Sequence, residues 1–526
     1  MSDYIMRILF FTPCSILALV LMSADLLADT VALSEQDLVP IGPSVWTVPQ
    51  LDLQPQDTQA PILGPRAHQD GARLLRHLNG SDGINGFEGV IYDNRDRDHS
   101  TLNPEHYPRL TFLEYGVDLM AKDLDIGLAG RFLLPHVVIG NSSMALERGK
   151  LRRSLPRLAM TDVFWHSVTS ALYLNNNIYA YPEHKDYDAE DRYPLNWPYM
   201  VITEGSSGSD RVFLDAFAMT LAAFRAETFA TLREKRLVAP TLQMLLRRSL
   251  TSVTSREDYL SGVAHPPVFS GLQVSGGRMV AQAAEMRPED IPPLVSVRVI
   301  EEDFSSRAGL AGLSERLLDS PAAIARLWRN VAWEREMRVS VADTVALDGQ
   351  ELTFEWRLLR GDPDLVRIDP EGPDGRTARL RIAWHDPWNE VGVGRKNREY
   401  ERRVSRVDIG VFANNGVHDS APALISIDFP EHQIRQYTNG ENGFRLTSID
   451  YDARGRKAYF DPLLYWSAPW TDTARYDDAG LLLGWDRRGA EGEQVFVPAS
   501  DAAVSIADPR ISASNSLVSV LRRGNN

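Results

Sequence analysis

The spacing of hydrophobic residues along the chain predicts an α/β domain in its first two thirds. Short apolar runs predict strands over residues 89–92, 110–115, 133–139, 199–203 and 294–300. Apolar residues at helical spacing predict helices over residues 160–175, 210–237 and 276–286. Asp210 precedes the most regular of these helices and is a suitable N-cap. Because strands and helices alternate at this spacing, we expect an α/β domain over residues 61–335.

The pattern changes near Met337. From there on, short runs of alternating hydrophobic and polar residues, separated by turn residues, replace the helical spacing. Over residues 338–430 the turns contain Asp-Gly, Asp-Pro and Asn-Gly pairs, which predicts a β-sandwich. Residues 431–526 hold two Tyr-Asp-x-x-Gly segments, at 451–455 and 476–480, which predict a C-terminal region rich in β-hairpins. The fold class is therefore multidomain, with a domain boundary expected between about residues 330 and 340.

Two segments of the predicted sandwich resemble a PKD or cadherin-like domain, which has an immunoglobulin-like (Ig-like) fold. The resemblance lies in residues 348–356 (DGQELTFEW) and 406–416 (RVDIGVFANNG). It implies that the first segment is a strand carrying a core tryptophan and that the second is a late strand entering a turn. Such domains are spacers or modules that contact glycans and proteins, and some bind calcium. The acidic turn residues Asp343, Asp348 and Asp362 are then calcium candidates, although ordinary turn chemistry explains them equally well.

The N-terminus predicts export. Arg7 precedes an apolar run over residues 8–22, and small residues follow before the chain turns polar at Asp29. At about 15 residues this run is shorter than the roughly 20 that span a bilayer as a helix. We therefore expect a signal peptide over residues 1–28, a secreted or periplasmic location and no transmembrane domain in the mature chain. An uncleaved N-terminal anchor is the alternative.

An extended leader is expected over residues 29–60, which are rich in Pro, Gln, Leu and Asp without a clear period. The chain as a whole resembles exported bacterial proteins to which no activity has been assigned. The resemblance rests on residues 92–100 and 204–210. That resemblance implies an arrangement of domains but no particular activity.

Charge and cysteine content narrow the range of functions. The formal net charge of −15 argues against nucleic acid as a partner, because phosphate backbones attract basic surfaces. The single cysteine, Cys14, lies within the predicted signal peptide. Cleavage would leave a cysteine-free chain, which excludes disulfides, thiolate nucleophiles and Cys-ligated metals.

The turn over residues 204–210 is the first candidate site. A strand-like run leads into Glu204-Gly205-Ser206-Ser207-Gly208-Ser209-Asp210, and a long helix follows. This order suits an anion site at a helix N-terminus, and it also suits a nucleophile elbow with Ser207 as nucleophile. The segment reads Gly-x-Ser-x-Ser and so lacks the second glycine of the elbow. A capped helix start with a flexible turn is the alternative.

Two acidic clusters are candidate metal or acid–base sites. Asp93, Asp96, Asp98 and His99 directly follow a predicted strand, and alternating carboxylates on a loop can hold a hard cation. Interleaved arginines favour ion pairs within the loop instead. The second cluster lies in a Tyr-rich segment, and its candidate ligands are His184, Asp186 and Asp188. A solvated polar loop is the alternative here.

Histidine and aromatic residues add two further candidates. His265, which precedes two prolines, is a candidate base for Ser207, as are His99 and His184. Aromatic residues are frequent near the C-terminus, where they form either a carbohydrate-stacking platform or the core of a β-domain. They are Trp384, Trp388, Tyr465, Trp466, Trp470, Tyr476 and Trp485.

These observations favour an exported hydrolase that acts on extracellular or cell-surface polysaccharide or ester substrates. Its site is expected where the 204–210 turn shares a pocket with Asp93, Asp96 or His184, because parallel strands end at one edge of a sheet. The alternative is a non-catalytic surface protein that binds glycans or proteins, since no catalytic signature is complete.

Overall fold

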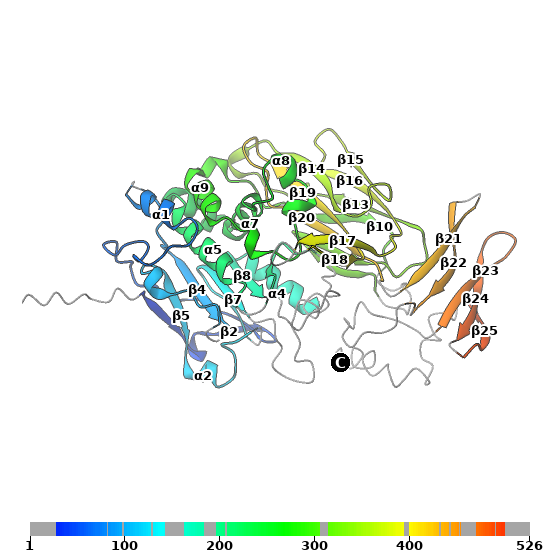
Figure 1. Ribbon diagram of the computed structural model, residues 1–526, viewed down its shortest axis with the longest axis horizontal. Coiled ribbons are helices and arrows are strands. Elements are labelled where there is room, and N and C mark those ends of the chain that lie inside the picture. The colour runs from blue at the N-terminus through cyan, green and yellow to red at the C-terminus, as the bar shows by residue number, and fades with distance from the viewer. Residues whose placement is uncertain are drawn as a thin grey trace, which may run out of the picture.

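The computed structural model describes most of the chain between residues 28 and 499 (Figure 1). The described residues are 28–80, 83–96, 99–127, 130–142, 163–182, 196–205, 208–305, 314–393, 399–430, 433–440, 443–451, 453, 470–489 and 491–499.

A six-stranded parallel sheet forms the centre of the N-terminal part. Its spatial order is β1 (Thr30–Leu33), β5 (Thr111–Tyr115), β4 (Val90–Arg95), β7 (Val137–Ser142), β8 (Asn177–Pro182) and β9 (Val201–Thr203). Every neighbouring pair is parallel. Strands β7 and β8 inside the sheet and β9 at its edge are buried along their whole length, as expected for a sheet covered on both faces. This confirms the predicted α/β arrangement. It also places residues 30–33, expected in an extended leader, on the edge of the sheet.

Helices pack around this sheet. They include α1 (Ala72–Asn79), α4 (Val163–Tyr173), α5 (Arg211–Ala223), α6 (Ala226–Glu234), α7 (Val238–Arg248) and α9 (Gly276–Glu285). Helix α5 contacts both β7 and α9, and all of its residues from 213 to 223 are buried. Of the helices that the structure describes, none combines the length and apolar character needed to cross a membrane.

The helix predicted over residues 210–237 is two helices. At Phe224 the backbone becomes extended (φ −55°, ψ 145°), and α6 begins at Ala226. The Phe224 carbonyl accepts a hydrogen bond of 2.6 Å from the Asn85 N–H, and Arg225 forms a β-bridge with Ile84. The helix therefore ends where its backbone pairs with a distant segment, which the local hydrophobic pattern does not record.

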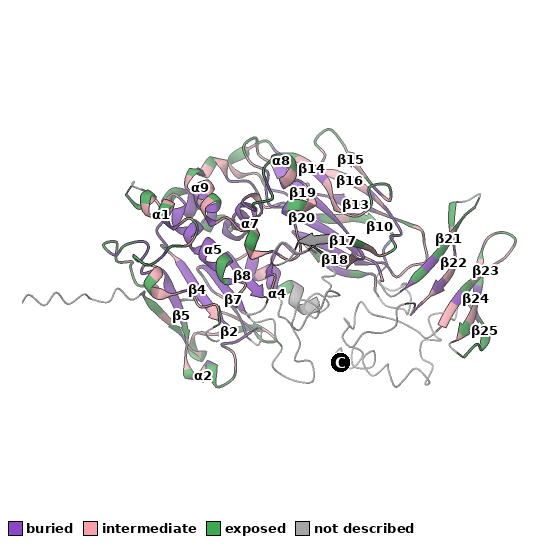
Figure 2. Cartoon of the chain, in the orientation of Figure 1, coloured by how far each residue is buried: buried purple, intermediate pink, exposed green. Residues whose placement is uncertain are grey.

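Two sheets pack face to face to form a β-sandwich. One has the order β10 (Arg298–Glu302), β13 (Glu334–Ser340), β16 (Thr377–Ala383) and β15 (Val366–Glu371). The other has the order β11 (Arg316–Ser320), β12 (Ala323–Leu327), β20 (Ala423–Asp428), β19 (Arg406–Asn414) and β14 (Thr353–Arg360). A buried cluster that includes Trp328, Leu380 and Ile425 fills the space between them. Strands β12, β19 and β20 are almost wholly buried, whereas β10 and β15 are mostly half-buried or exposed (Figure 2).

Residues 298–327, expected in the α/β domain, supply three strands of the sandwich. β10 pairs with β13, and β12 pairs in parallel with β20. Within the described residues, the sandwich thus begins earlier along the chain than its predicted start at 338. How the chain divides into independently folding domains stays a prediction, as does the Ig-like character of the sandwich.

The sandwich contacts the helical layer directly. The Tyr259 hydroxyl at the end of α8 (Arg256–Tyr259) donates a 2.7 Å hydrogen bond to the Ser420 carbonyl, and Arg256 forms an ion pair with Asp419 at 2.8 Å. The backbone at Gly262 lies so close to the Leu359 carbonyl that a Cβ there would stand 2.2 Å from its oxygen. This close approach requires glycine.

Smaller sheets complete the fold. One contains β2 (Val39–Gly42), β3 (Val45–Thr47) and β6 (Arg131–Leu133), and β17 (Trp388–Val393) pairs with β18 (Glu399–Val404). The last sheet contains β21 (Ile434–Gly440), β22 (Gly443–Asp450), β23 (Trp470–Tyr476), β24 (Leu482–Gly489) and β25 (Gln494–Pro498). The predicted turn at 476–480 does join a hairpin, β23–β24. The segment 451–455 lies mostly outside the described residues.

Candidate functional site

The strand order of the parallel sheet creates a crevice between β4 and β7. From β4 the chain continues to β5 on one side, whereas β7 is followed by β8 on the other side. Loops that leave adjacent parallel strands in opposite directions open a crevice at the carboxyl ends of those strands. Residues 93–96, His99, Ser100 and Asn141 lie at this place, and the start of α5 adjoins it (Figure 1).

Ser100 joins the loop after β4 to the turn before α5. Its hydroxyl donates a short hydrogen bond to Asp210 Oδ1 and accepts one of 2.8 Å from the Gly208 N–H. Ser100 has a φ of 56°, in the left-handed region that serine seldom adopts. The structure therefore brings Asp210 and Gly208, two residues of the predicted turn site, to the loop that carries Asp96 and His99.

Asp210 is fully buried at the N-terminus of α5. Burial raises the pKa of its carboxyl group, while hydrogen bonds from the Ser100 hydroxyl and the neighbouring Asn141 amide act in the opposite direction. Its second oxygen, Oδ2, is buried and has no hydrogen-bond partner among the described residues. A buried carboxylate oxygen without a partner is costly and uncommon in folded proteins, which makes this atom a candidate contact for a water molecule or a ligand.

Asp96 presents a second buried carboxylate to the crevice. Its side chain is 6% exposed, and its Oδ2 also has no hydrogen-bond partner among the described residues. Burial raises the pKa of Asp96 from 3.8 to about 6; the nearby His99 lowers it, and the negative charge of Asp210 raises it further. His99 Nδ1 lies 3.8 Å from Asp96 Oδ2, and the His99 side chain is 63% exposed.

Asp93, predicted as a catalytic residue, lies in a different environment. Its two oxygens accept hydrogen bonds from the hydroxyls of Tyr115 (2.8 Å) and Tyr179 (2.7 Å). Burial raises the pKa of Asp93, and the charge of Arg95 opposes this shift. Arg95 itself lies over the Phe132 ring. Asp93 thus belongs to a buried polar cluster within the sheet, and both of its oxygens are already occupied.

The turn itself is built around two glycines. Gly205 and Gly208 have φ values of 116° and 94°, which side-chain-bearing residues rarely adopt. Ser209 Oγ lies 2.8 Å from Thr203 Oγ1 and donates to the Gly205 carbonyl, which closes the turn. The Glu204 N–H pairs with the Phe269 carbonyl at 2.8 Å and so continues β9.

Several predicted site residues lie outside the described residues. They are Ser206, Ser207, His184, Asp98, Asp186 and Asp188. Their roles stay predictions.

His265 is not placed to act as a base. Its Nε2 lies 2.6 Å from the Tyr259 carbonyl, and its Nδ1 lies 3.3 Å from Arg247 Nη1. The ring packs between Tyr259 and Phe412, and burial holds its pKa well below the usual range. Because both ring nitrogens are engaged, His265 supports the contact between the helical layer and the sandwich.

Nothing in the described part of the chain forms a metal cluster: no three His, Cys, Asp or Glu side chains there lie close enough to hold an ion. Of the two acidic clusters predicted as metal sites, Asp93, Asp96 and His99 lie among the described residues, and Asp98, His184, Asp186 and Asp188 do not. Of the calcium candidates, Asp343 forms an ion pair with Arg298 at 2.7 Å. Asp362 Oδ1 accepts the N–H of Asp364, as a turn residue does.

Sequence reasoning missed two residues that hold the site together, Ser100 and Asn141. The Asn141 side chain accepts a 3.0 Å hydrogen bond from the Tyr92 hydroxyl and donates one of 3.0 Å to the His99 carbonyl. The strand containing Asn141 was expected to end at residue 139, yet β7 continues to Ser142. An Asn at the carboxyl end of a central strand was the available signal.

Comparisons with known proteins give only weak similarities. No protein-family model and no curated protein sequence matches this chain. A solved nucleoside hydrolase-related protein from Saccharophagus degradans, described as associated with carbohydrate metabolism, is 10% identical with a TM-score of 0.18. The alignment covers 56% of this chain and 62% of that protein, so the chain spans less than two thirds of it.

Two structures of Drosophila immunoglobulin repeats are similarly distant. The Ig1-2 module of the receptor protein tyrosine phosphatase DLAR and the tandem Ig repeats of Dlar are each 10% identical, with a TM-score of 0.12. The alignments cover 39% of this chain and 98% and 97% of those chains. At such TM-scores none of these likenesses carries an argument about fold or function.

Proposed function

We propose that this chain is an exported hydrolase that cleaves glycosidic or ester bonds of an extracellular or cell-surface polymer, with its chemistry at the crevice between β4 and β7. One observation carries the proposal. Two buried carboxylates, Asp96 and Asp210, lie near enough there for the charge of Asp210 to raise the pKa of Asp96, and each has an oxygen without a hydrogen-bond partner among the described residues. Paired carboxylates in different environments are the usual equipment for acid–base hydrolysis.

The environments of the two carboxylates suggest which one donates a proton and which one accepts a proton. Asp96, with a pKa of about 6, still carries a proton in part of the molecules near neutral pH. Burial raises the pKa of Asp210 as well, but the hydrogen bond from Ser100 and the positive end of the α5 dipole act against this shift and favour its charged form. Asp96 is therefore the proton donor, and Asp210 is the base.

The proposed reaction adds water across the bond. Asp210 takes a proton from a water molecule, whose oxygen forms the new bond to the carbon under attack. The bond to the leaving oxygen breaks, and the proton of Asp96 passes to that oxygen. A proton exchange between the two carboxyl groups and solvent then restores the starting state.

An ester substrate offers a second route at the same crevice. Ser207, predicted as a nucleophile, belongs to the turn before α5, and His99 and His184 are its candidate bases. In this route Asp96 and Asp210 position groups and do not transfer protons.

Two carboxylate variants and one serine variant distinguish these routes. Asp96→Asn, Asp210→Asn and Ser207→Ala would be assayed on polysaccharides, aryl glycosides, aryl esters and acetylated glycans. Asp364→Asn is the matched control, because Asp364 is an exposed aspartate on a sandwich loop. We expect both carboxylate variants to lose at least about 100-fold in kcat, and the serine variant to retain its activity.

Other outcomes would change the conclusion. Loss of ester hydrolysis in Ser207→Ala alone would replace the carboxylate mechanism with acyl transfer. Full activity in both carboxylate variants would refute the proposed site. No turnover of any substrate by the wild-type protein would favour the alternative, a surface protein that binds glycans or proteins without chemistry.

A further inference from the structure

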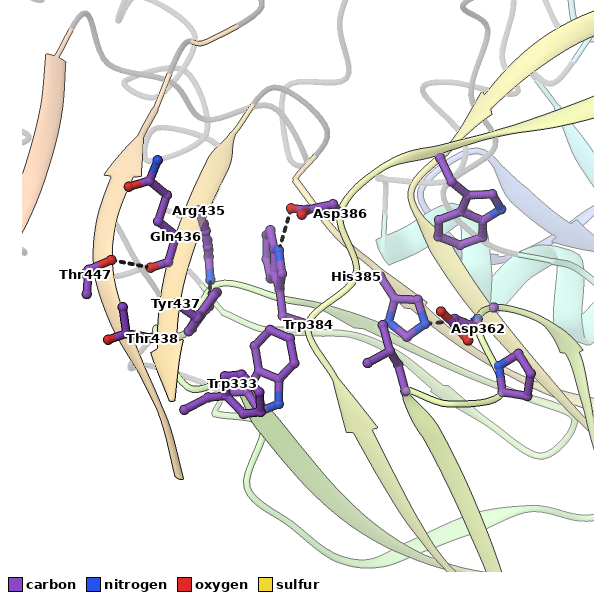
Figure 3. Close-up of a pocket in the computed structure, with 15 residues that line it drawn as sticks. Trp333, Asp362, Trp384, His385, Asp386, Arg435, Gln436, Tyr437, Thr438 and Thr447 are labelled. Atoms are coloured by element: carbon purple, nitrogen blue, oxygen red, sulfur yellow. Dashed lines mark hydrogen bonds between the residues drawn. The ribbon is translucent and has the colours of Figure 1, made fainter. Parts of the chain in front are cut away.

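A cleft lies between the sandwich and the C-terminal sheet, apart from the crevice between β4 and β7. Its volume is about 950 Å³, and all of its lining residues come from residues 333–447. The residue before β13, the turn before β15 and the segment from the end of β16 to the start of β17 form one wall, and β21 and β22 form the other (Figure 3). The volume is within the range of pockets that bind small organic molecules, roughly 300–1,000 Å³.

Aromatic rings dominate the surface of this cleft. Trp333 stacks on Phe444 with ring centroids 4.4 Å apart, and its edge contacts Tyr437 at 5.0 Å. Phe444 is 47% exposed, which is unusual for a side chain of this size. Trp388 is half-buried on the opposite side and lies 5.7 Å from the His385 ring. The cleft thus presents aromatic surface from both of its walls.

Polar groups lie between these rings and are held in place. The Trp384 indole donates a 2.9 Å hydrogen bond to Asp386, which fixes this exposed carboxylate at the mouth (Figure 3). The N–H of Asp362 donates to His385 Nε2 at 3.1 Å, and the Thr447 hydroxyl donates to the Gln436 carbonyl. A few oriented polar groups on an aromatic surface give specificity to such a site.

The cleft holds charges of both signs, Arg435 and the two carboxylates of Asp362 and Asp386, so its charge does not select for a strongly charged ligand. Arg435 lies over the Trp384 ring at 4.0 Å, and this buried cation repels another cation. The carboxylates of Asp362 and Asp386 repel an anion in the same way. A suitable ligand is therefore neutral, with flat apolar faces for the rings and hydroxyl groups for the carboxylates and amides.

Sugar rings combine these properties, because their C–H faces stack on aromatic rings while their hydroxyls form hydrogen bonds at the edges. We infer that this cleft binds a neutral saccharide, as a short stretch of oligosaccharide or polysaccharide. The inference is independent of hydrolysis at the crevice between β4 and β7, since the two sites share no lining residue.

Retention on insoluble polysaccharides tests the inference. The full-length protein would be mixed with cellulose, chitin, xylan and starch, and oligosaccharides of any polymer that retains it would be titrated by calorimetry. Phe444→Ala and Trp388→Ala should each weaken binding at least tenfold. Phe496→Ala is the matched control, because Phe496 is a 41% exposed aromatic residue on β25 of the same sheet and outside the cleft.

The remaining variants separate this site from the proposed active site. Asp96→Asn should bind polysaccharide as the wild type does, even where it has lost turnover. Thermal melting checks that each variant is folded; should Trp388→Ala fail, Phe444→Ala decides, because its side chain is exposed. Wild-type protein that no polysaccharide retains, or equal binding by Phe444→Ala and the control, would overturn the inference.

Discussion

Replacement of Asp96 by Asn should stabilise the protein at neutral pH while removing its activity. The ionised carboxylate is unfavourable because it is buried beside the charge of Asp210. A rise in pKa from 3.8 to about 6 corresponds to about 3 kcal/mol, at about 1.4 kcal/mol for each pKa unit. Asn removes this charge, and among the described residues no hydrogen bond to the Asp96 side chain is lost. A residue that costs stability where it lies is typical of a functional site.

The pH dependence of this effect has a definite sign. Between the unfolded pKa of 3.8 and the folded pKa of about 6, the native protein holds a proton that the unfolded chain has released. The free energy of unfolding of the wild type therefore falls as the pH rises through this window. The advantage of Asp96→Asn is thus full above pH 6 and disappears below about pH 4.

Urea unfolding at a series of pH values measures this difference. Tryptophan fluorescence would follow the wild type, Asp96→Asn and the control Asp364→Asn between pH 4 and 8. The control replaces an exposed aspartate in the sandwich. Its free energy of unfolding should differ from that of the wild type by an amount that does not grow between pH 4 and pH 6. The reasoning would be refuted if Asp96→Asn were no more stable than the wild type at pH 7. It would also be refuted if the difference in free energy of unfolding between the two were the same at pH 4 and pH 7.

Three further predictions concern the proposed site, a buried ion pair of the sandwich and the N-terminus. His99→Gln removes a charge that lowers the pKa of Asp96, so the fall in kcat above pH 6 should move to higher pH in a pH–rate profile. Glu315→Ala leaves Arg335, 2% exposed, without its buried partner at 3.0 Å and should cost about 3–5 kcal/mol in urea unfolding; a loss below 1 kcal/mol would contradict this. Mass spectrometry of the protein from its native host should find a mature chain that begins after residue 28, and an intact Met1 would contradict export.

The α/β part could be predicted where buried strands and amphipathic helices leave a local pattern. The predicted strands at 110–115 and 199–203 and the helix at 276–286 correspond to β5, β9 and α9. Strand β8 was missed because residues 177–182 (NIYAYP) alternate neither as an amphipathic strand nor as a purely aliphatic run. Its Asn177 amide donates to the carbonyl of His136, 41 residues earlier, which only the folded sheet brings near.

The start of the sandwich could not be read from local pattern. Strand β12 pairs in parallel with β20, a partner about one hundred residues later in the chain. Nothing within residues 316–327 encodes that partner, and the same apolar run suits a strand of the α/β domain equally well. Pairing with a distant strand decides to which sheet a strand belongs, and a local sequence pattern does not record it.

The site illustrates the same limit on the scale of single residues. The predicted strand ended at Tyr92, which left Asp93 and Asp96 in one loop, but β4 continues to Arg95. Successive strand residues point to opposite faces, so Tyr92 reaches Asn141 while Asp93 meets Tyr115 and Tyr179. Extending the strand by three residues is enough to separate the two aspartates.

The packing between the helical layer and the sandwich affects how the two proposed sites work together. The hydrogen bond from Tyr259 to Ser420 and the ion pair of Arg256 with Asp419 join these parts without an intervening linker. A saccharide chain that is bound in the aromatic cleft and also reaches the crevice between β4 and β7 would therefore span a fixed separation between the two proposed sites. Cleft variants such as Phe444→Ala should then slow hydrolysis of a long polymer and leave short substrates unaffected. Equal slowing of both would mean that the cleft acts through the fold and does not hold the polymer.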